Sequence, residues 1–247
     1  MKSQSPLKIG NKMNNAAIGI LMLETNFPRL MGDIGHKDTW NFPVHFRVVS
    51  GASAQKVVHH DPQKLFDAFV GVGRELIADG CSGITTSCGF LGLMQEELKD
   101  ALGVPFASSS LMQLPWIEAM LPSGQEAGVL TISEERLSAA HLHASGARGT
   151  TAIAGLPKTG AFAEAIFKDK DHMDIAACRR ETCEAAERLV STHPNVGAIV
   201  LECTNLGPYA ANIKDATGRP VYSIVSFLNW FQSGLKPPRF QVDKLNE

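Results

Sequence analysis

An internal repeat is the feature of this 247-residue sequence that most restricts its fold. The segment from Cys88 to Pro105 aligns with the segment from Cys203 to Pro220 at an offset of 115 residues (203 − 88), and 8 of the 18 aligned positions are identical. Chance does not produce agreement of this extent. The repeat therefore predicts two similar half-domains, each of which presents one cysteine at an equivalent point.

Short apolar runs alternate with helical stretches along the chain. Alternation of this kind is typical of parallel sheets whose strands are joined by right-handed helical crossovers. We predict an α/β fold with two pseudo-symmetric domains, each a short parallel sheet flanked by helices, and an active-site cleft between them. The first domain is expected over residues 16–112 plus 224–247 and the second over 113–223, after a loose tail of residues 1–15. The predicted strands are 18–23, 44–50, 83–87, 105–108, 127–132, 150–154, 196–201 and 220–224, and the predicted helices are 62–79, 91–102, 111–120, 173–192 and 227–232, with a further helix start at 133–136.

Composition and charge exclude several classes of partner. The formal net charge is −2 and the sequence has no lysine or arginine run, so nothing indicates binding to nucleic acid or to an anionic membrane. No stretch is long enough to span a bilayer, and the apolar segment 16–23 is not followed by the small-residue cleavage site of a signal peptide. The 5 cysteines are an odd number, which predicts free thiols in a reducing compartment and hence a cytoplasmic protein.

Cys88 and Cys203 each lie between the end of a predicted strand and the start of a helix. Ligands of open α/β sheets bind beyond the carboxyl ends of the strands. A helix N-terminus supplies free N–H groups and partial positive charge, which favour a thiolate and can hold a carboxylate. An isolated cysteine is commonly a small buried apolar residue, but recurrence at the repeat position favours a chemical role. We expect two thiols of lowered pKa that work as an acid/base pair on opposite faces of one carbon.

The motifs Thr86-Ser87-Cys88-Gly89 and Glu202-Cys203-Thr204-Asn205, set in two α/β halves, resemble the aspartate/glutamate racemase superfamily over residues 16–235. This group includes amino-acid racemases, hydantoin racemases, maleate isomerases and arylmalonate decarboxylases. The resemblance implies that one cysteine thiolate removes an α-proton while the other thiol delivers a proton to the opposite face, with no metal or other cofactor. It implies an isomerase, namely a cofactor-independent racemase or epimerase of a small carboxylate-bearing substrate such as aspartate or glutamate.

The same resemblance assigns site residues by position. Cys88 and Cys203 match the catalytic pair, and backbone amides with Ser, Thr or Asn side chains hold the substrate carboxylate in this family. The matching substrate-binding positions here are Asn26, Thr25, Ser87, Gly89, Thr131, Thr204 and Asn205. For any single polar residue of this set, a role in a turn or a helix cap explains its presence equally well.

The chain departs from the pattern of glutamate racemases. Those enzymes carry Asp-Ser-Gly after the first strand and a histidine soon after the second cysteine, whereas this sequence has Glu24-Thr25-Asn26 and Asn205. A role in cell-wall glutamate supply is therefore not expected, and the presence of both cysteines disfavours the single-cysteine decarboxylases. A hydantoin racemase, in which Arg29 or Asn26 would serve carbonyl groups, stays an alternative, as do a maleate isomerase-like enzyme and a non-catalytic protein that binds a small acid.

No other pattern in the sequence indicates a metal site. Cys178 and Cys183 are five residues apart on a predicted helix and point away from each other, and His141 and His143 face nearly opposite sides. The glycine-containing loop 32–42 either covers the cleft as a lid or is a fixed surface loop. The apolar cluster near the C-terminus packs onto the first domain or onto a second subunit. Because members of the family are often oligomers, we expect a homo-oligomer, a dimer or higher.

Overall fold

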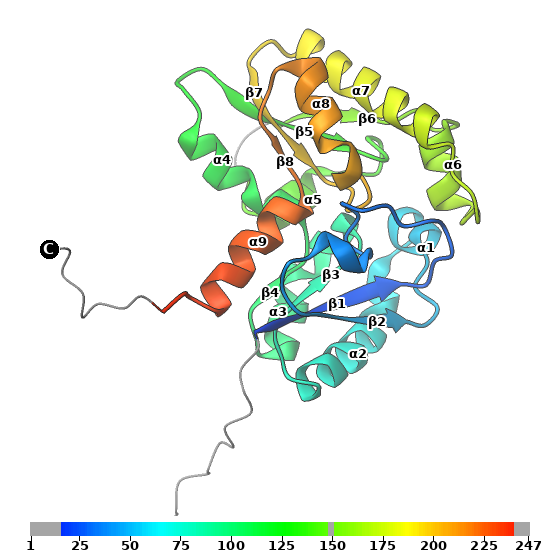
Figure 1. The fold of residues 1–247 in the computed structure, drawn as a ribbon, viewed down its shortest axis with the longest axis vertical. Helices are drawn as coiled ribbons and strands as arrows, with labels where there is room; N and C mark the ends of the chain where they lie inside the picture. The colour runs from blue at the N-terminus through cyan, green and yellow to red at the C-terminus, as the bar shows by residue number, and fades with distance from the viewer. Residues whose placement is uncertain (1–15, 148–150, 240–247) are drawn as a thin grey trace, which may run out of the picture.

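The computed structural model describes residues 16–147 and 151–239, which form two four-stranded parallel sheets (Figure 1). The first sheet has the order β2-β1-β3-β4 and the second the order β6-β5-β7-β8, so the two halves share one topology. The predicted α/β class with two pseudo-symmetric halves is confirmed, whereas the predicted tail 1–15 and the strand residue Thr150 lie outside the described residues. The strands are β1 (Ala17–Leu23), β2 (Val44–Val49), β3 (Cys81–Thr86), β4 (Phe106–Ala107), β5 (Glu126–Thr131), β6 (Ala152–Gly155), β7 (Val196–Leu201) and β8 (Val221–Tyr222).

The central strands are buried because helices cover both faces of each sheet. Every residue of β1 and of β7 is buried, and both strands read as nearly continuous apolar runs. β1 lies between β2 and β3, and β5 lies between β6 and β7, all in parallel register. The pairings of β1 with β3 and of β5 with β7 both contain a register shift at the first residue of the strand, so the duplication extends to this detail.

The repeat in the sequence includes a matched pair of helix stops. α3 (Gln95–Leu102) ends at Gly103 with φ 65°, and α8 (Ala210–Thr217) ends at Gly218 with φ 68°. Glycine adopts this left-handed conformation at little cost, and the next strand of each half then pairs with the strand that precedes the cysteine. The identical residues at the end of the repeat therefore serve to end the helix and turn the chain, and they do not indicate a chemical role.

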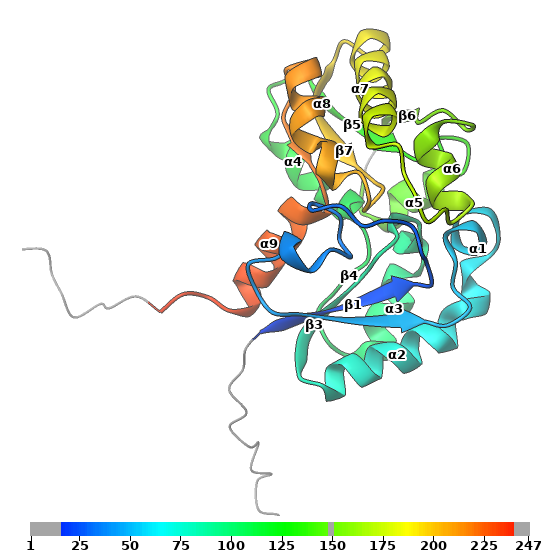
Figure 2. The same cartoon turned by 45° about the vertical axis from the view of Figure 1, so that its right-hand side comes forward.

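The remaining helices surround the two sheets (Figure 2). The short helices α1, α6 and α8 were not predicted, because six to eight residues give too little periodicity. The helix start predicted at 133–136 is wrong: the N–H of Arg136 closes a turn onto the carbonyl of Ser133, and α5 begins after Ser138. These helices are α1 (Ala54–His59), α2 (Phe66–Ala78), α4 (Leu114–Met120), α5 (Ala139–Ala144), α6 (Ala161–Phe167), α7 (Ile175–Thr192) and α9 (Ile224–Leu235).

The C-terminal helix α9 leaves the second sheet and packs against the first (Figure 1). Phe227 and Leu228 join the buried cluster that contains Ile18 and Ile20 of β1. Trp230 stays 55% exposed and lies against Trp116 of α4, with ring centroids 4.2 Å apart.

The predicted homo-oligomer stays a prediction. None of the helices in the described segments 16–147 and 151–239 is long and apolar enough to cross a membrane.

Candidate active site

A small cavity lies where the two halves meet, beyond the carboxyl ends of the central strands. Its walls come from the segments that follow β1, β3, β5 and β7, and from α1 and α6. Both halves therefore contribute to one site, as the duplicated cysteine predicts. The lining residues are Leu23, Thr25, Phe27, Arg29, Ala54, Val58, Ser87, Cys88, Gly89, Phe90, Ile132, Ile166, Phe167, Glu202, Cys203, Thr204 and Asn205.

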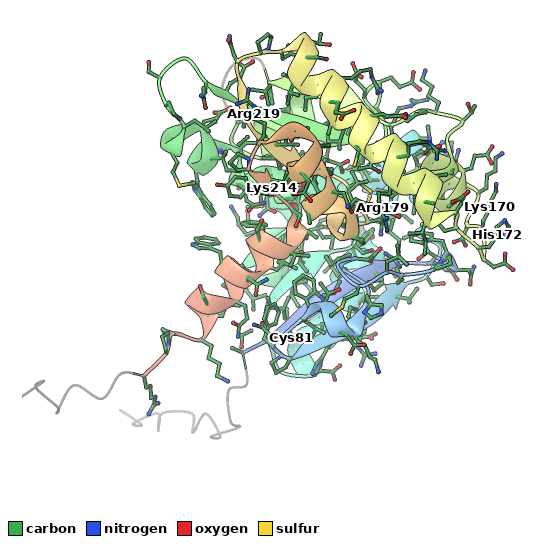
Figure 3. The ribbon with its side chains drawn as sticks, turned by 45° about the horizontal axis from the view of Figure 1, so that its top comes forward. Cys81, Lys170, His172, Arg179, Lys214 and Arg219 are labelled. Carbon is green, nitrogen blue, oxygen red and sulfur yellow. The ribbon has the colours of Figure 1, made fainter. Side chains whose placement is uncertain are left out.

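The structure brings the two predicted catalytic cysteines to this single cavity. Cys88 is the residue before a 3₁₀ helix over Gly89–Met94, and Cys203 precedes a turn that leads to a shorter 3₁₀ helix over Gly207–Tyr209. In each half the carbonyl of the cysteine accepts the N–H of the residue three positions later, so the local geometry is also repeated. By contrast, Cys81, which is labelled in Figure 3, begins β3, whereas Cys88 follows the last residue of that strand.

The predicted lowering of the thiol pKa values is wrong. Burial raises the pKa of Cys88 to about 12, and the nearby Glu202 carboxylate adds to the rise, although the N–H groups of Phe90 and Leu91 oppose it. Burial and Glu202 also raise the pKa of Cys203 well above its usual value. The N-terminal N–H groups are present as expected, but desolvation of a thiolate in a closed pocket outweighs them.

This electrostatic balance predicts how the thiols react with an alkylating reagent. Well below its pKa, a thiol gains about tenfold in thiolate fraction for each pH unit, and the thiolate is the nucleophile. We expect alkylation of Cys88 by iodoacetamide, followed by peptide mass spectrometry, to accelerate about tenfold from pH 7.5 to 8.5 and again to 9.5. Glutathione, which titrates within this range, is the control whose rate levels off. A rate at Cys88 that reaches a plateau below pH 9 would contradict the raised pKa.

Glu202 occupies the position in the second half that Ser87 occupies in the first (202 − 87 = 115). Its side chain is wholly buried, and its Oε2 accepts a hydrogen bond of 2.7 Å from the hydroxyl of Thr131. Its Oε1 has no hydrogen-bond partner among the described residues. Burial raises the pKa of this carboxyl to about 7. Thr131, predicted to bind substrate, is thus engaged with Glu202 and does not line the cavity.

Gly89 has a role that the sequence did not reveal. A Cβ atom at this position would overlap Oε1 of Glu202 and lie 2.5 Å from the Glu202 carbonyl oxygen. Gly89 lines the cavity as predicted, and its missing side chain leaves the space that the buried carboxyl of Glu202 fills.

Ser87 and Thr204 join the two halves beside the cysteines. The hydroxyl of Thr204 donates to the carbonyl of Ser87 at 2.7 Å, and the Ser87 hydroxyl accepts the N–H of Leu23 at 2.8 Å. Both residues line the cavity, so their predicted substrate-binding role stays a prediction alongside this structural one. The hydroxyl of Ser110 also donates to the carbonyl of Leu201, which adds a second hydrogen bond between the two halves.

A polar network around Arg29 forms another wall. The guanidinium pairs with Asp33 at 2.9 Å and donates to the Thr25 hydroxyl at 2.7 Å, and the Asn205 amide donates to Asp33 at 2.6 Å. The thiol of Cys203 lies 3.6 Å from Oδ1 of Asn205. The network joins the loop after β1 to the loop after β7, and it orients Asn205 toward a cysteine. Asp33 belongs to the segment 32–42, which this network holds in place.

Asn26, like Thr131, is a predicted site residue that does not line the cavity. Its amide and backbone N–H donate to the carboxylate of Asp169, at 2.8 and 2.6 Å, and it is not among the residues that line the cavity. No local pattern predicts this pairing, because the two residues are 143 positions apart. Three phenylalanines that do line the cavity, Phe27, Phe90 and Phe167, carried no recognisable sequence signal.

No group of three or more His, Cys, Asp or Glu side chains that could hold a metal ion is present in the described part of the chain. The polar groups of the cavity are thiols, hydroxyls, one amide, one guanidinium and one carboxyl. This set can remove and return protons and can bind a small charged molecule.

Comparison with solved structures identifies the fold. The chain superimposes on arylmalonate decarboxylase with a TM-score of 0.59 and 16% identity, covering 91% of this chain and 94% of that one. It also matches allantoin racemase from Klebsiella pneumoniae (TM-score 0.60, 18% identity, 88% and 87% covered) and a glutamate racemase from Bacillus anthracis (TM-score 0.59, 10% identity, 90% and 84% covered). The chain therefore shares the fold of these enzymes, of a second allantoin racemase and of an aspartate racemase homologue, as the resemblance noted from the two motifs implies. No protein-family model matches the sequence.

Curated relatives correct the predicted activity. Dimethylsulfoniopropionate lyase of Durusdinium sp. clade D is 26% identical over 243 residues, which covers 94% of this chain and 79% of the relative. Dimethylsulfoniopropionate lyase 7 of Emiliania huxleyi is 26% identical over 239 residues, which covers 92% and 70%. These relatives are lyases, so the prediction of an isomerase that racemises an amino acid such as aspartate or glutamate is wrong. What the chain shares with the racemases is the fold.

Proposed function

We propose that this protein is a lyase that cleaves dimethylsulfoniopropionate, or a closely similar β-sulfonio carboxylate, into a dialkyl sulfide and an acrylate. The similarity to dimethylsulfoniopropionate lyases supports the reaction class. The observation on which the proposal chiefly rests is that two thiols, of which Cys88 is half-buried and Cys203 buried, line a single small cavity with one guanidinium and three phenylalanine rings. Cleavage of such a substrate needs a base, a carboxylate site and a place for a methylated cation, and these groups supply them.

The reaction requires removal of one proton from the carbon next to the carboxylate. A cysteine thiolate takes this proton, the electron pair of the C–H bond forms the new C=C bond, and the electron pair of the C–S bond leaves with sulfur. The products are acrylate, neutral dimethyl sulfide and a protonated cysteine, so atoms and charge balance. Because the sulfide departs as a neutral molecule, no acid is needed on its side, and one ionised thiol suffices for this step.

Arg29 is the group that we place at the substrate carboxylate. Two of its nitrogens are already oriented by Asp33 and Thr25, and the guanidinium lies 4.3 Å from the centroid of the Phe27 ring. A guanidinium has five N–H donors, so others stay available for a carboxylate. As the α-proton leaves, negative charge grows on the carboxylate oxygens, and a fixed cation there lowers the barrier.

The raised thiol pKa values fit a substrate that brings its own positive charge. In the free protein, burial and the Glu202 carboxylate keep Cys88 and Cys203 protonated. A sulfonium cation in the same cavity favours thiolate formation, since opposite charges at short range stabilise the ionised form. The aromatic rings of Phe27, Phe90 and Phe167 offer faces to which methylated cations bind. A cysteine thiol then becomes a thiolate base when the substrate binds.

The proposal is tested with the purified full-length protein and dimethylsulfoniopropionate. We expect dimethyl sulfide in the headspace, measured by gas chromatography, and acrylate in solution, measured by proton NMR, in a 1:1 ratio. The matched control is 3-(methylthio)propanoate, which has an uncharged thioether in place of the sulfonium. Its sulfur would have to leave as an anionic thiolate, so it should give no acrylate. Absence of both products from dimethylsulfoniopropionate would reject the lyase proposal.

We also propose the cytoplasm as the compartment, which the five free thiols support.

A further inference from the structure

The carboxyl of Glu202 is a charged group that the reaction described above does not use. It follows β7 directly, its relative exposure is 0%, and its Oε1 has no hydrogen-bond partner within residues 16–147 and 151–239. Burying a carboxylate oxygen without a partner costs free energy, because the protein replaces its hydration with nothing. A group of this kind at a cavity wall indicates that a ligand supplies the missing interaction.

The position of Glu202 places this unsatisfied charge beside the reacting atoms. Glu202 lines the same cavity as Cys88 and Cys203, and its carboxylate raises the pKa of both thiols. Oε2 is held by Thr131, and Gly89 leaves room for Oε1. The carboxyl is therefore held near both cysteines, and at pH values above about 7 it carries a negative charge.

The other charges of the cavity do not neutralise Glu202. Arg29 is the basic residue among those that line the cavity, and its guanidinium is paired with Asp33. These two groups cancel in formal charge, so the described residues of the site carry a net charge of −1 through Glu202 (Arg29 +1, Asp33 −1, Glu202 −1). A cation complements this site, and an uncharged ligand leaves the carboxylate unsatisfied.

We propose that Glu202 determines substrate specificity by recognising a positive charge on the β-substituent of a small carboxylate. This inference rests on the proposed function and assigns the recognition of the two charges of its substrate, with the carboxylate at Arg29 and the onium group toward Glu202. The charge of Glu202 also keeps the thiols protonated until a cationic group arrives. A carboxylate without an onium group that enters the cavity thus meets a thiol and not a thiolate.

A pair of ligands of nearly equal shape tests the proposal by calorimetric titration at pH 8.5. The zwitterion is 3-(trimethylammonio)propanoate, and its partner is the anion 4,4-dimethylpentanoate, in which an uncharged carbon replaces the ammonium nitrogen. We expect the wild type to bind the zwitterion at least tenfold more tightly than the anion. Glu202→Gln keeps an oxygen that can accept from Thr131, and we expect it to bind the two ligands with affinities within about twofold of each other.

Asp67→Asn is the matched control. It removes the same formal charge from an exposed position on α2, away from the lining of the cavity, and should keep the wild-type preference. A tenfold preference that persists in Glu202→Gln overturns the proposal, and so does a wild type that binds the two ligands equally or binds neither. A wild type that releases dimethyl sulfide but shows no preference overturns this inference alone. A wild type with the Glu202-dependent preference but no lyase activity overturns the proposed reaction alone.

Discussion

Replacing the cysteine that acts as base with serine is expected to lower kcat/KM for cleavage of dimethylsulfoniopropionate by about 10²- to 10⁴-fold, the usual contribution of a general base. A hydroxyl ionises far less readily than a thiol, and the cavity that raises the pKa of Cys88 to about 12 disfavours an alkoxide further. Cys88→Ser and Cys203→Ser are measured separately by release of dimethyl sulfide. The variant with the greater loss identifies the base, because elimination requires one proton to be removed and none to be delivered.

The double variant and a distant cysteine serve as controls. If the two thiols act in one step, the double variant should be no worse than the worse single variant, since residues that act as a unit are not additive. Cys183→Ser, at a half-buried position on α7 outside the cavity, should retain wild-type activity. Wild-type rates in both Cys88→Ser and Cys203→Ser would show that neither thiol is the base.

Gly89→Ala is expected to disable the site and to lower the free energy of unfolding by about 1–3 kcal/mol, the range for overpacking a rigid interior. The added methyl group would overlap a side-chain oxygen and a backbone oxygen of Glu202. The backbone oxygen cannot move independently, because the N–H of Glu202 bonds to Leu130 in the sheet. The two halves must therefore separate locally, and that displaces both cysteines. Urea denaturation and the dimethyl sulfide assay measure the two effects.

Gly71→Ala is the matched control for the glycine substitution. Gly71 lies within α2, and a Cβ atom there would meet nothing within 4 Å. Alanine at such a position reduces the freedom of the unfolded chain and should raise stability by about 0.4–1 kcal/mol. A Gly89→Ala protein that matches the wild type in stability and activity would contradict the close packing of Gly89 against Glu202.

Local patterns predicted most of the fold. The buried strands β1 and β7 are apolar runs that end where polar residues begin, and α7 is long enough for its periodicity to be read. The repeat then required two similar sheets. The short helices α1 and α6 escaped prediction because tertiary contacts, and not periodicity, stabilise six or seven residues as a helix.

The site was predicted in part, for reasons that particular residues make clear. Cys88 and Cys203 were found because the repeat singles them out, and Ser87, Gly89, Thr204 and Asn205 were found because they adjoin the cysteines. Glu202 was visible in the motif, but its unpartnered oxygen results from packing against Gly89, which is 113 residues away (202 − 89). The thiol pKa values were mispredicted because a sequence shows which N–H groups are near and not how completely water is excluded.

The reaction class was mispredicted for a related reason. Proton removal beside a carboxylate is common to racemisation and to elimination, and the group carried by the next carbon decides which of the two reactions occurs. The motif around each cysteine indicates which residue could remove the proton. It carries no information on the group attached to the next carbon of the substrate. The cavity walls, formed by Phe27 and Phe167 among others, come from segments that the motif does not include.

The difference between Ser87 and Glu202 at equivalent positions has a stereochemical consequence. Dimethylsulfoniopropionate is achiral, yet the two hydrogens on its α-carbon are prochiral, and a cavity with mirror-like halves could remove either of them. Under the proposed reaction, we expect a neutral hydroxyl on one side and a carboxyl on the other to orient the molecule in a single sense between Cys88 and Cys203. The label of a substrate deuterated stereospecifically at that carbon should then be wholly retained in acrylate for one configuration and wholly lost for the other.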